Sequence, residues 1–318
     1  MKKHLGTILR IGITVLGLAL AFSAIDFSQL VDKFAHARWE WLLLAFLLIN
    51  LSLVLRAYRW LLLLQGLGVK NVKFSRLVEL YFAGNFFNSF LPSGFGGDVV
   101  RVVEVAQEVP TDVATGTVFL DRFTGLLILF VMGLLALPFR PENFPDVWAA
   151  AIALVCVAGL VGGFVLLDGR LIRKLGGWLP GPLNPNGDTP IAKFLQAVQG
   201  CGWQAIGGAL AVSTVFAFML VGWWTATTHA MNAPVPFAYN LLVVPIFAVA
   251  LLVPTFGGIG VREALAGPLY AAAGLDPATA VAVALAVTLL LRLAGLLGAP
   301  IYVWTTIRKK RATSQQTA

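Results

Sequence analysis

Long apolar runs separated by short polar stretches recur from one end of the chain to the other. A helix needs about 20 mainly apolar residues to cross the hydrocarbon core of a bilayer. Six runs reach that length, over residues 5–25, 39–64, 113–137, 147–167, 203–230 and 279–305. The pattern therefore predicts an all-α polytopic membrane protein with six full spans and a single integral membrane domain over residues 1–318.

The first run begins like a secretory signal peptide. Lys2 and Lys3 precede its apolar stretch, which ends in small residues up to Ala24, so cleavage there is an alternative. Because five further spans follow, we expect the first run to be retained as a span.

Two further apolar runs, over residues 77–91 and 241–253, are too short to cross comfortably. Each stops at a proline that is followed by a cluster of glycines. Proline cannot continue the hydrogen bonding of a helix, and glycine permits a sharp reversal. The prolines and glycines of the two breaks are Pro92, Gly96, Gly97, Pro254, Gly257, Gly258 and Gly260. We predict two re-entrant or broken-helix hairpins, each of which needs a buried polar environment.

The basic residues are distributed unevenly between the predicted loops. With six spans and two hairpins, 14 Lys and Arg fall on the side of the amino terminus and 3 on the other. This bias places both termini in the cytoplasm, together with a loop over residues 168–202 and a basic, disordered tail over residues 308–318. The hairpins then enter from opposite sides, as in transporters built from inverted repeats. The alternative is a pair of unrelated Pro/Gly loops.

Charge and composition agree with a membrane protein. Hydrophobic residues make up 58% of the chain and charged residues 12%, about half the charged share of a soluble domain. The net charge of +8 follows from basic residues at membrane borders, so we expect contact with anionic headgroups at the cytoplasmic face and no nucleic-acid partner.

Ionisable residues within membrane segments are the first functional candidates, because they are costly there. Arg56 and Arg59 share a helix face, although snorkelling to the interface is an alternative that suits Arg59 better. Asp121 and Arg122 are adjacent and point in different directions, so we expect each to pair with another segment. A purely structural network of ion pairs is the alternative. The candidate headgroup-binding residues are Arg56, Arg59, Asn85, Asn88, Pro92, Gly96, Gly97, Asp98, Arg101, Asp121, Arg122, Pro254, Gly257, Gly258, Gly260, Arg262, Glu263 and Arg292.

The half-helices that follow the two breaks supply a second reason to expect anion binding. A helix that begins near Gly97 or Gly260 directs free N–H groups and the positive end of its dipole into the protein. Inside a bilayer a lipid phosphate is the natural anion for such a site. Asp98 has an alternative role as the N-cap of its half-helix.

Patterns of catalysis and metal binding are absent from the sequence. There is no HExxH, GxSxG or Walker A motif, and Cys156 and Cys201 stand alone. We therefore expect no catalytic residue, metal or cofactor, and no enzymatic activity.

Four stretches, over residues 56–60, 85–101, 121–123 and 254–263, resemble a known family. They are similar to recurring stretches of the flippase-like membrane domain of lysylphosphatidylglycerol synthases, and the resemblance covers nearly the whole chain. It implies transbilayer movement of lipids, which are aminoacylated phospholipids in the two-domain members. The family often has Glu where this chain has Asp98. Only polar residues follow Arg311, so we expect no aminoacyl-transfer domain and no synthesis of lysylphosphatidylglycerol.

The leading hypothesis is a lipid flippase or transporter of the inner or plasma membrane, with a polar midplane site between the hairpins. The resemblance implies phospholipids, hopanoids or polyprenyl-linked glycans as substrates and does not choose among them. Without an ATP site, transport is expected to be downhill or coupled to an ion gradient. Two alternatives stay open, namely a membrane enzyme acting on a lipid phosphate and a non-catalytic partner of a separate lipid-modifying enzyme. Homo-oligomerisation is also left open.

Overall fold

The computed structural model describes residues 2–23, 27–91, 95–176, 184–185, 189–250, 255 and 258–316, and these residues form helices without any strand. In chain order the helices are α1 (Lys2–Phe22), α2 (Phe27–Ala35), α3 (Trp39–Gly66), α4 (Phe74–Phe90), α5 (Gly96–Val105), α6 (Thr111–Ala136), the 3-10 turn Leu137–Phe139, α7 (Asp146–Asp168), α8 (Arg170–Gly176), α9 (Pro190–Gly200), α10 (Trp203–Ala230), α11 (Phe237–Ala250), α12 (Val261–Ala271), α13 (Pro277–Leu296) and α14 (Gly298–Gln316). The all-α prediction is confirmed.

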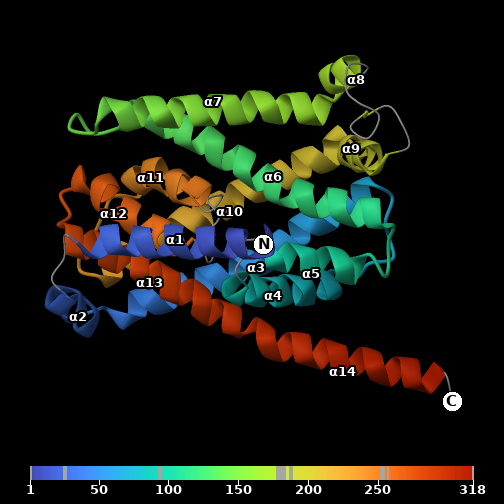
Figure 1. Cartoon of the computed structure of the whole chain (residues 1–318), viewed down its shortest axis with the longest axis horizontal. Helices are drawn as coiled ribbons and strands as arrows, with labels where there is room; N and C mark the ends of the chain where they lie inside the picture. Colours follow the sequence, from blue (N-terminus) through green and yellow to red (C-terminus); the bar gives the residue numbers. More distant parts are fainter. Residues whose placement is uncertain are drawn as a thin grey trace.

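Five helical stretches in the described part of the chain are long and apolar enough to cross a membrane. They are Trp39–Gly66, Thr111–Phe139, Asp146–Asp168, Trp203–Ala230 and Pro277–Arg308. The longest helices run lengthwise beside one another in Figure 1. The remaining expected span coincides with α1, whose described apolar stretch, Gly12–Phe22, is shorter. The chain is therefore a multi-pass membrane protein.

Local sequence signals set several helix ends. Asp276 caps α13, because its carboxylate accepts from the Thr279 backbone N–H at 2.9 Å and Pro277 occupies the first turn. Gly169 ends α7 in the left-handed conformation with φ 69, which glycine adopts without strain.

Both short apolar runs form pairs of short helices, as predicted. In the first pair, α4 and α5 touch through their backbones, and a Cβ on Gly97 would lie 1.9 Å from the Gly84 carbonyl oxygen. The second pair is α11 and α12. The turns themselves lie outside the described residues, and so do the predicted site residues Pro92, Pro254 and Gly257.

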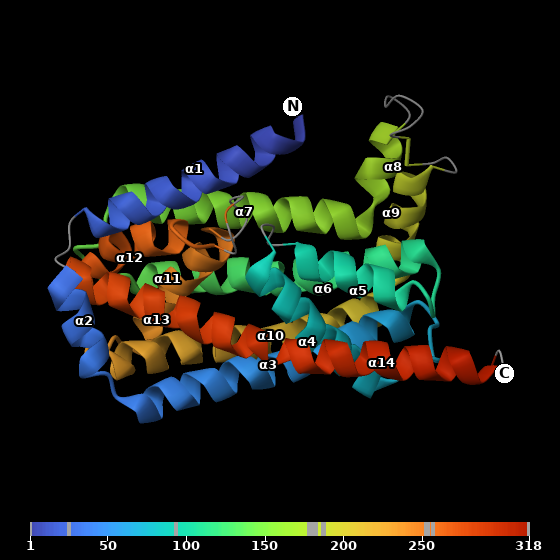
Figure 2. The same cartoon turned by 60° about the horizontal axis from the view of Figure 1, so that its bottom comes forward.

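Helix α13 shows that the two helix pairs approach each other from opposite ends of the bundle. The Thr288 hydroxyl contacts Arg262 and Glu263 at the beginning of α12, whereas a Cβ on Gly295 would meet the Ser89 hydroxyl at the end of α4. These two positions on α13 are about 10 Å apart. Figure 2 shows α11 and α12 in the left half of the molecule and α4 and α5 in the right half. This arrangement agrees with two opposed hairpins.

The carboxyl-terminal region differs from the prediction. The last apolar run is interrupted at Leu297, between α13 and α14. The tail expected to be disordered from residue 308 instead continues α14 as far as Gln316. Lys, Arg, Ala and Gln are good helix formers and extend a helix that has already begun.

Candidate functional site

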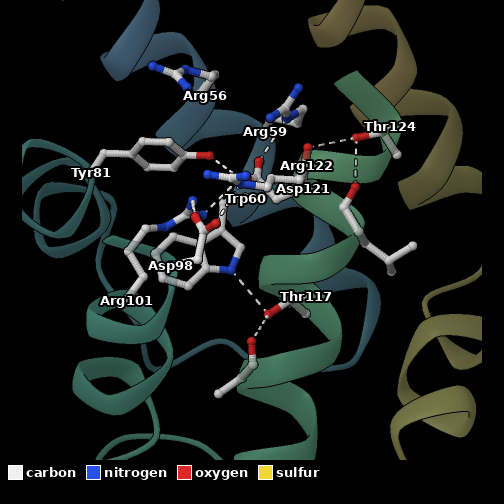
Figure 3. A network of polar contacts seen from close by, with 12 residues as sticks. Arg56, Arg59, Trp60, Tyr81, Asp98, Arg101, Thr117, Asp121, Arg122 and Thr124 are labelled. Carbon is white, nitrogen blue, oxygen red and sulfur yellow. Dashed lines mark hydrogen bonds and ion pairs between the residues drawn. The ribbon is translucent and has the colours of Figure 1, made fainter. Parts of the chain in front are cut away.

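A single carboxylate, Asp121 on α6, joins three helices. Its Oδ1 accepts from Arg59 Nε on α3 at 2.8 Å, and its Oδ2 accepts from Arg101 on α5 at 2.8 Å. The Tyr81 hydroxyl on α4 also donates to Oδ2. Because Asp121 is only 1% exposed, these three donors replace the water that would otherwise solvate its charge. Figure 3 shows this network at close range.

The network continues through a second carboxylate, Asp98 on α5. Its Oδ1 lies 3.3 Å from Arg101, and its Oδ2 lies 2.5 Å from Arg122 Nε on α6. The result is a row of five alternating charges, in the order Arg59, Asp121, Arg101, Asp98, Arg122. As predicted, Asp121 and Arg122 pair with other segments and not with each other.

Asp98 is not an N-cap, which corrects the alternative drawn from the sequence. Helix α5 begins at Gly96 and its capping position is Phe95, without a side-chain cap. Asp98 therefore lies in the first turn, where its carboxylate benefits from the helix dipole while it pairs with Arg101 and Arg122.

Arg101 is held between two aromatic rings. Its guanidinium lies 4.3 Å from the Trp60 ring centroid and 3.9 Å from that of Tyr81. The Trp60 indole donates to the Thr117 hydroxyl at 3.1 Å, which fixes the ring in turn. Because Arg101 stacks between two rings and pairs with two carboxylates, its guanidinium is held in one orientation.

Arg59 is a buried residue, so the snorkelling interpretation is wrong for it. Its side chain is 3% exposed, and its NH1 donates to the Ser213 hydroxyl on α10 at 2.9 Å. Space for the guanidinium comes from Gly125, where a Cβ would lie 2.8 Å from NH1. Arg59 turns inward because Asp121 offers it an opposite charge that the sequence alone does not locate.

Arg56 lies one turn before Arg59 on α3 and stands outside the row of charges. Its Nε donates to the Ser52 backbone carbonyl at 3.3 Å. Its guanidinium lies 5.4 Å from the Tyr81 ring and 5.0 Å from the Phe216 ring. In Figure 3, Arg56 is on the opposite side of Tyr81 from Asp98, and no dashed line reaches it.

These side chains surround a cavity of about 50 Å³. That volume admits a few water molecules or one small polar group. The lining residues are Leu53, Arg56, Arg59, Tyr81, Gly84, Asn85, Asn88, Asp98, Arg101, Asp121 and Arg122. Four of them are arginines and two are aspartates, so the lining carries an excess of two positive charges. The cavity is lined by α3, α4, α5 and α6 and by no described residue of the second hairpin, whereas the sequence predicts a polar site between the two hairpins.

The two asparagines of α4 have different roles. Asn88 Oδ1 accepts from the Gly97 backbone N–H at 2.7 Å, which satisfies one free donor at the start of α5. Asn85 Nδ2 is buried and has no acceptor among the described residues. Asn88 therefore stabilises the hairpin, whereas Asn85 retains an unused donor at the cavity.

The second hairpin carries a separate cluster around Glu263. Its Oε2 accepts from the Gly260 backbone N–H at 2.7 Å, and its Oε1 accepts from Thr288, whose hydroxyl in turn accepts from Arg262 at 2.8 Å. Glu263 caps its own helix, whereas Asp98 at the corresponding position of α5 pairs with cationic side chains.

The predicted site residues therefore divide between two places. The first is the cavity with Arg56, Arg59, Asn85, Asn88, Asp98, Arg101, Asp121 and Arg122, with Gly96 and Gly97 at the start of α5. The second is the closed cluster with Gly258, Gly260, Arg262 and Glu263. Arg292 is associated with this second cluster, because its charge is attracted by the opposite charge of Glu263.

Several side chains of the site were not predicted from the sequence. Tyr81 shares the face of α4 that carries Asn85 and Asn88, a spacing that would have found it. Trp60, Gly125 and Ser213 give no comparable signal, because each has an ordinary role in an apolar helix.

No group of His, Cys, Asp or Glu within the described ranges is arranged to hold a metal ion. The geometry defines a class of protein, a multi-pass helical membrane protein with a buried, positively charged cavity beside a broken helix. The chain belongs to the family described as Lysylphosphatidylglycerol synthase TM region, whose pattern matches residues 7–298. The resemblance found in the four sequence stretches is confirmed.

One relative shares most of its length with this chain. It is a UPF0104 membrane protein of Pyrococcus horikoshii, 25% identical over an alignment of 312 positions that covers 89% of this chain and 91% of the relative. Its name states a membrane protein and no activity.

Proposed function

We propose that the protein moves lipids across the bilayer, with the polar headgroup in the cavity and the acyl chains in the membrane. The observation that supports the proposal is the charge of the lining, four arginines against two aspartates, in a cavity whose lining residues are all buried or half-buried. An uncompensated positive charge is costly at membrane depth and is reduced when an anion binds. Family membership supports the proposal, because it places the chain with the membrane region of lipid-modifying proteins.

The surroundings of the cavity suit a headgroup that enters from the bilayer. Arg122 is 39% exposed and lies 4.7 Å from the ring of Phe95, which is itself exposed. On α5, Val99 and Val103 follow Phe95 at intervals of four residues and are exposed, so this helix presents an apolar face outward. Acyl chains would lie against that face while the headgroup passes Arg122.

We also propose in which membrane the protein lies and what drives the movement of the lipid. The protein is placed in the inner or plasma membrane with both termini in the cytoplasm, following the distribution of Lys and Arg. It makes and breaks no covalent bond, and movement is downhill or coupled to an ion gradient. Its partners are the lipid substrate and anionic headgroups at the cytoplasmic face.

The experiment is a scrambling assay with the purified protein in vesicles that contain a fluorescent phospholipid. A membrane-impermeant quencher then reports the share of probe that has moved between leaflets. The full-length protein should increase that share, whereas Arg101→Lys, which keeps the charge but loses the planar fork, should slow movement severalfold. Arg140→Lys is the matched control, because Arg140 forms an exposed ion pair with Asp146.

Two results would contradict this function. The first is a protein that folds and reconstitutes but moves no probe of any headgroup class. The second is release of a chemically altered lipid, which would point to an enzyme. Stable co-purification of a soluble lipid-modifying enzyme without lipid movement would favour the partner role.

A further inference from the structure

The arginines of the cavity are not equivalent. Asp121 serves both Arg59 and Arg101, and Asp98 serves both Arg101 and Arg122. Each carboxylate of the lining is thus shared between two guanidiniums. Arg56 is the lining arginine that reaches neither of them.

Arg56 retains most of its capacity to donate. A guanidinium has five N–H donors, and Arg56 makes one hydrogen bond, to the Ser52 carbonyl at 3.3 Å, among the described residues. The Tyr81 and Phe216 rings near it offer only their π-electron faces. The remaining donors are suited to a planar or tetrahedral anion that accepts two hydrogen bonds at once.

Two more donors of the same cavity are unused. Asn85 Nδ2 on α4 and Arg101 Nε on α5 are buried and have no acceptor in the described part of the chain. Buried donors without a partner are rare, and each lowers stability until an acceptor reaches it. Together with Arg56, three neighbouring helices thus each contribute to the cavity lining a residue with a donor that has no partner among the described residues.

We propose that Arg56, Asn85 and Arg101 form a phosphate subsite, and that the lipid is recognised through its phosphate and not through a cationic or neutral part of its headgroup. A phosphate supplies only acceptor oxygens and one or two negative charges, which matches a set of donors with excess positive charge. An ammonium group supplies only donors and would add a third uncompensated positive charge. In a lipid that carries both groups, the phosphate occupies this cavity and the cationic group lies elsewhere.

This inference rests on the proposed function for its source of phosphate, a lipid, but it is tested by binding alone. The probe is a short-chain phosphatidylglycerol, compared with a diacylglycerol of equal chain length and with inorganic phosphate. The readout is the thermal unfolding midpoint of the detergent-solubilised full chain, which rises when a ligand binds the folded state. Titration of each probe gives an apparent Kd.

The expected result is a rise of the midpoint with phosphatidylglycerol and none with diacylglycerol. Arg56→Gln should weaken phosphatidylglycerol binding at least about tenfold, and Asn85→Ala by a smaller factor. Arg56→Lys should recover part of the affinity, which a merely structural role for the side chain would not predict. Arg140→Gln and Asn50→Ala are the matched controls, because neither residue lines the cavity, and both should bind as the unchanged chain does.

Three outcomes would overturn the inference. One is equal affinity for phosphatidylglycerol and diacylglycerol. Another is unchanged binding by a folded Arg56→Gln variant. The third is binding of inorganic phosphate as tight as that of the lipid, which would keep an anion site but remove the lipid as its source. The protein could bind phosphatidylglycerol through Arg56 and yet move no lipid in vesicles. That result would support this subsite and contradict transport, so failure of the subsite and failure of the proposed function can be told apart.

Discussion

Arg59 Nε lies 2.8 Å from Asp121 Oδ1, and neither side chain has more than 3% of its surface exposed. The two residues are 62 positions apart and belong to α3 and α6. Because the other oxygen of Asp121 accepts from Arg101 on α5, the same carboxylate ties the first hairpin to the helix bundle. Asp121 is therefore both a structural residue and part of the cavity.

Replacing Asp121 should destabilise the protein more than replacing any exposed carboxylate. Asp121→Asn removes the negative charge between Arg59 and Arg101 and leaves two buried guanidiniums with a neutral partner. Breaking a buried pair in this way costs about 3–5 kcal/mol. Thermal or denaturant unfolding in detergent measures the loss.

The control for this substitution is Asp146→Asn. Asp146 pairs with Arg140 at 2.6 Å, but its side chain is 90% exposed, so the same chemical change should cost at most about 1 kcal/mol. Equal stability of the two variants would contradict the structural role of Asp121.

Gly125 is predicted to control the position of Arg59. Gly125→Ala places a Cβ 2.8 Å from Arg59 NH1 and forces the guanidinium away from Asp121. We expect lipid movement to fall severalfold, although alanine favours a helix by up to about 1 kcal/mol over glycine. Gly162→Ala on α7 is the matched control, because nothing lies within 4 Å of its Cβ. Equal activity of both variants would show that the position of Arg59 does not matter.

The sequence predicts the elements well because each depends on a local signal. The apolar runs specify the long helices, and the Pro/Gly breaks specify the two hairpins. Beyond residue 308 the polarity of the sequence predicts a disordered tail, whereas the same residues are good helix formers when α14 precedes them. The ends of the spans followed from hydropathy, and the interruption at Leu297 directly precedes Gly298 and Pro300, which weaken a helix.

Close contact between α4 and α5 should depend on the absence of a side chain at Gly97. A Cβ there would lie 1.9 Å from the Gly84 carbonyl oxygen, a backbone atom that cannot rotate away. Gly97→Ala should separate the two helices and disrupt the row of charges from Asp98 onward, which lowers both the unfolding temperature and phosphatidylglycerol binding. Gly207→Ala on α10, whose Cβ would meet nothing within 4 Å, should leave both quantities unchanged. A Gly97→Ala protein with normal binding would contradict this packing.

The membership of the site was only partly predictable. Charged residues in apolar segments are conspicuous, so Arg56, Asp98 and Asp121 could be found from their cost alone. Their pairing could not, because Asp121 meets partners 62 and 20 residues away through the packing of three helices. Because helix packing cannot be read from the sequence, the different roles of Asp98 and Glu263 could not be predicted either. The two residues occupy the same position in their helices but have different neighbours.

The second hairpin is predicted to be structural. Thr288→Val preserves the shape of the side chain but removes the hydroxyl that links Arg262 to Glu263, and leaves a buried donor unsatisfied at a cost of about 1–3 kcal/mol. The apparent Kd for phosphatidylglycerol should not change. Thr214→Val is the control, because the Thr214 hydroxyl bonds only to the Leu210 carbonyl of its own helix. A large loss of binding by Thr288→Val would assign the second hairpin to the phosphate site.

The capping of α13 should make the stability of the protein depend on pH. Burial acts to raise the pKa of Asp276, but hydrogen bonds from the Thr279 hydroxyl and backbone N–H, with help from Lys33, outweigh it and lower the pKa overall. A depressed pKa in the folded state means that the ionised cap stabilises the protein above the unfolded-state pKa of about 3.9. That contribution is lost as the pH falls through the lower, folded-state pKa. Asp276→Asn keeps an oxygen that can cap the helix, but its amide cannot ionise. The unchanged chain should therefore be more stable than this variant at neutral pH. The difference in stability should disappear in acid. The unfolding midpoints of both proteins, measured between neutral pH and about pH 3, report this difference. A difference that stays constant over the whole range would show that the charge of Asp276 does not contribute to stability.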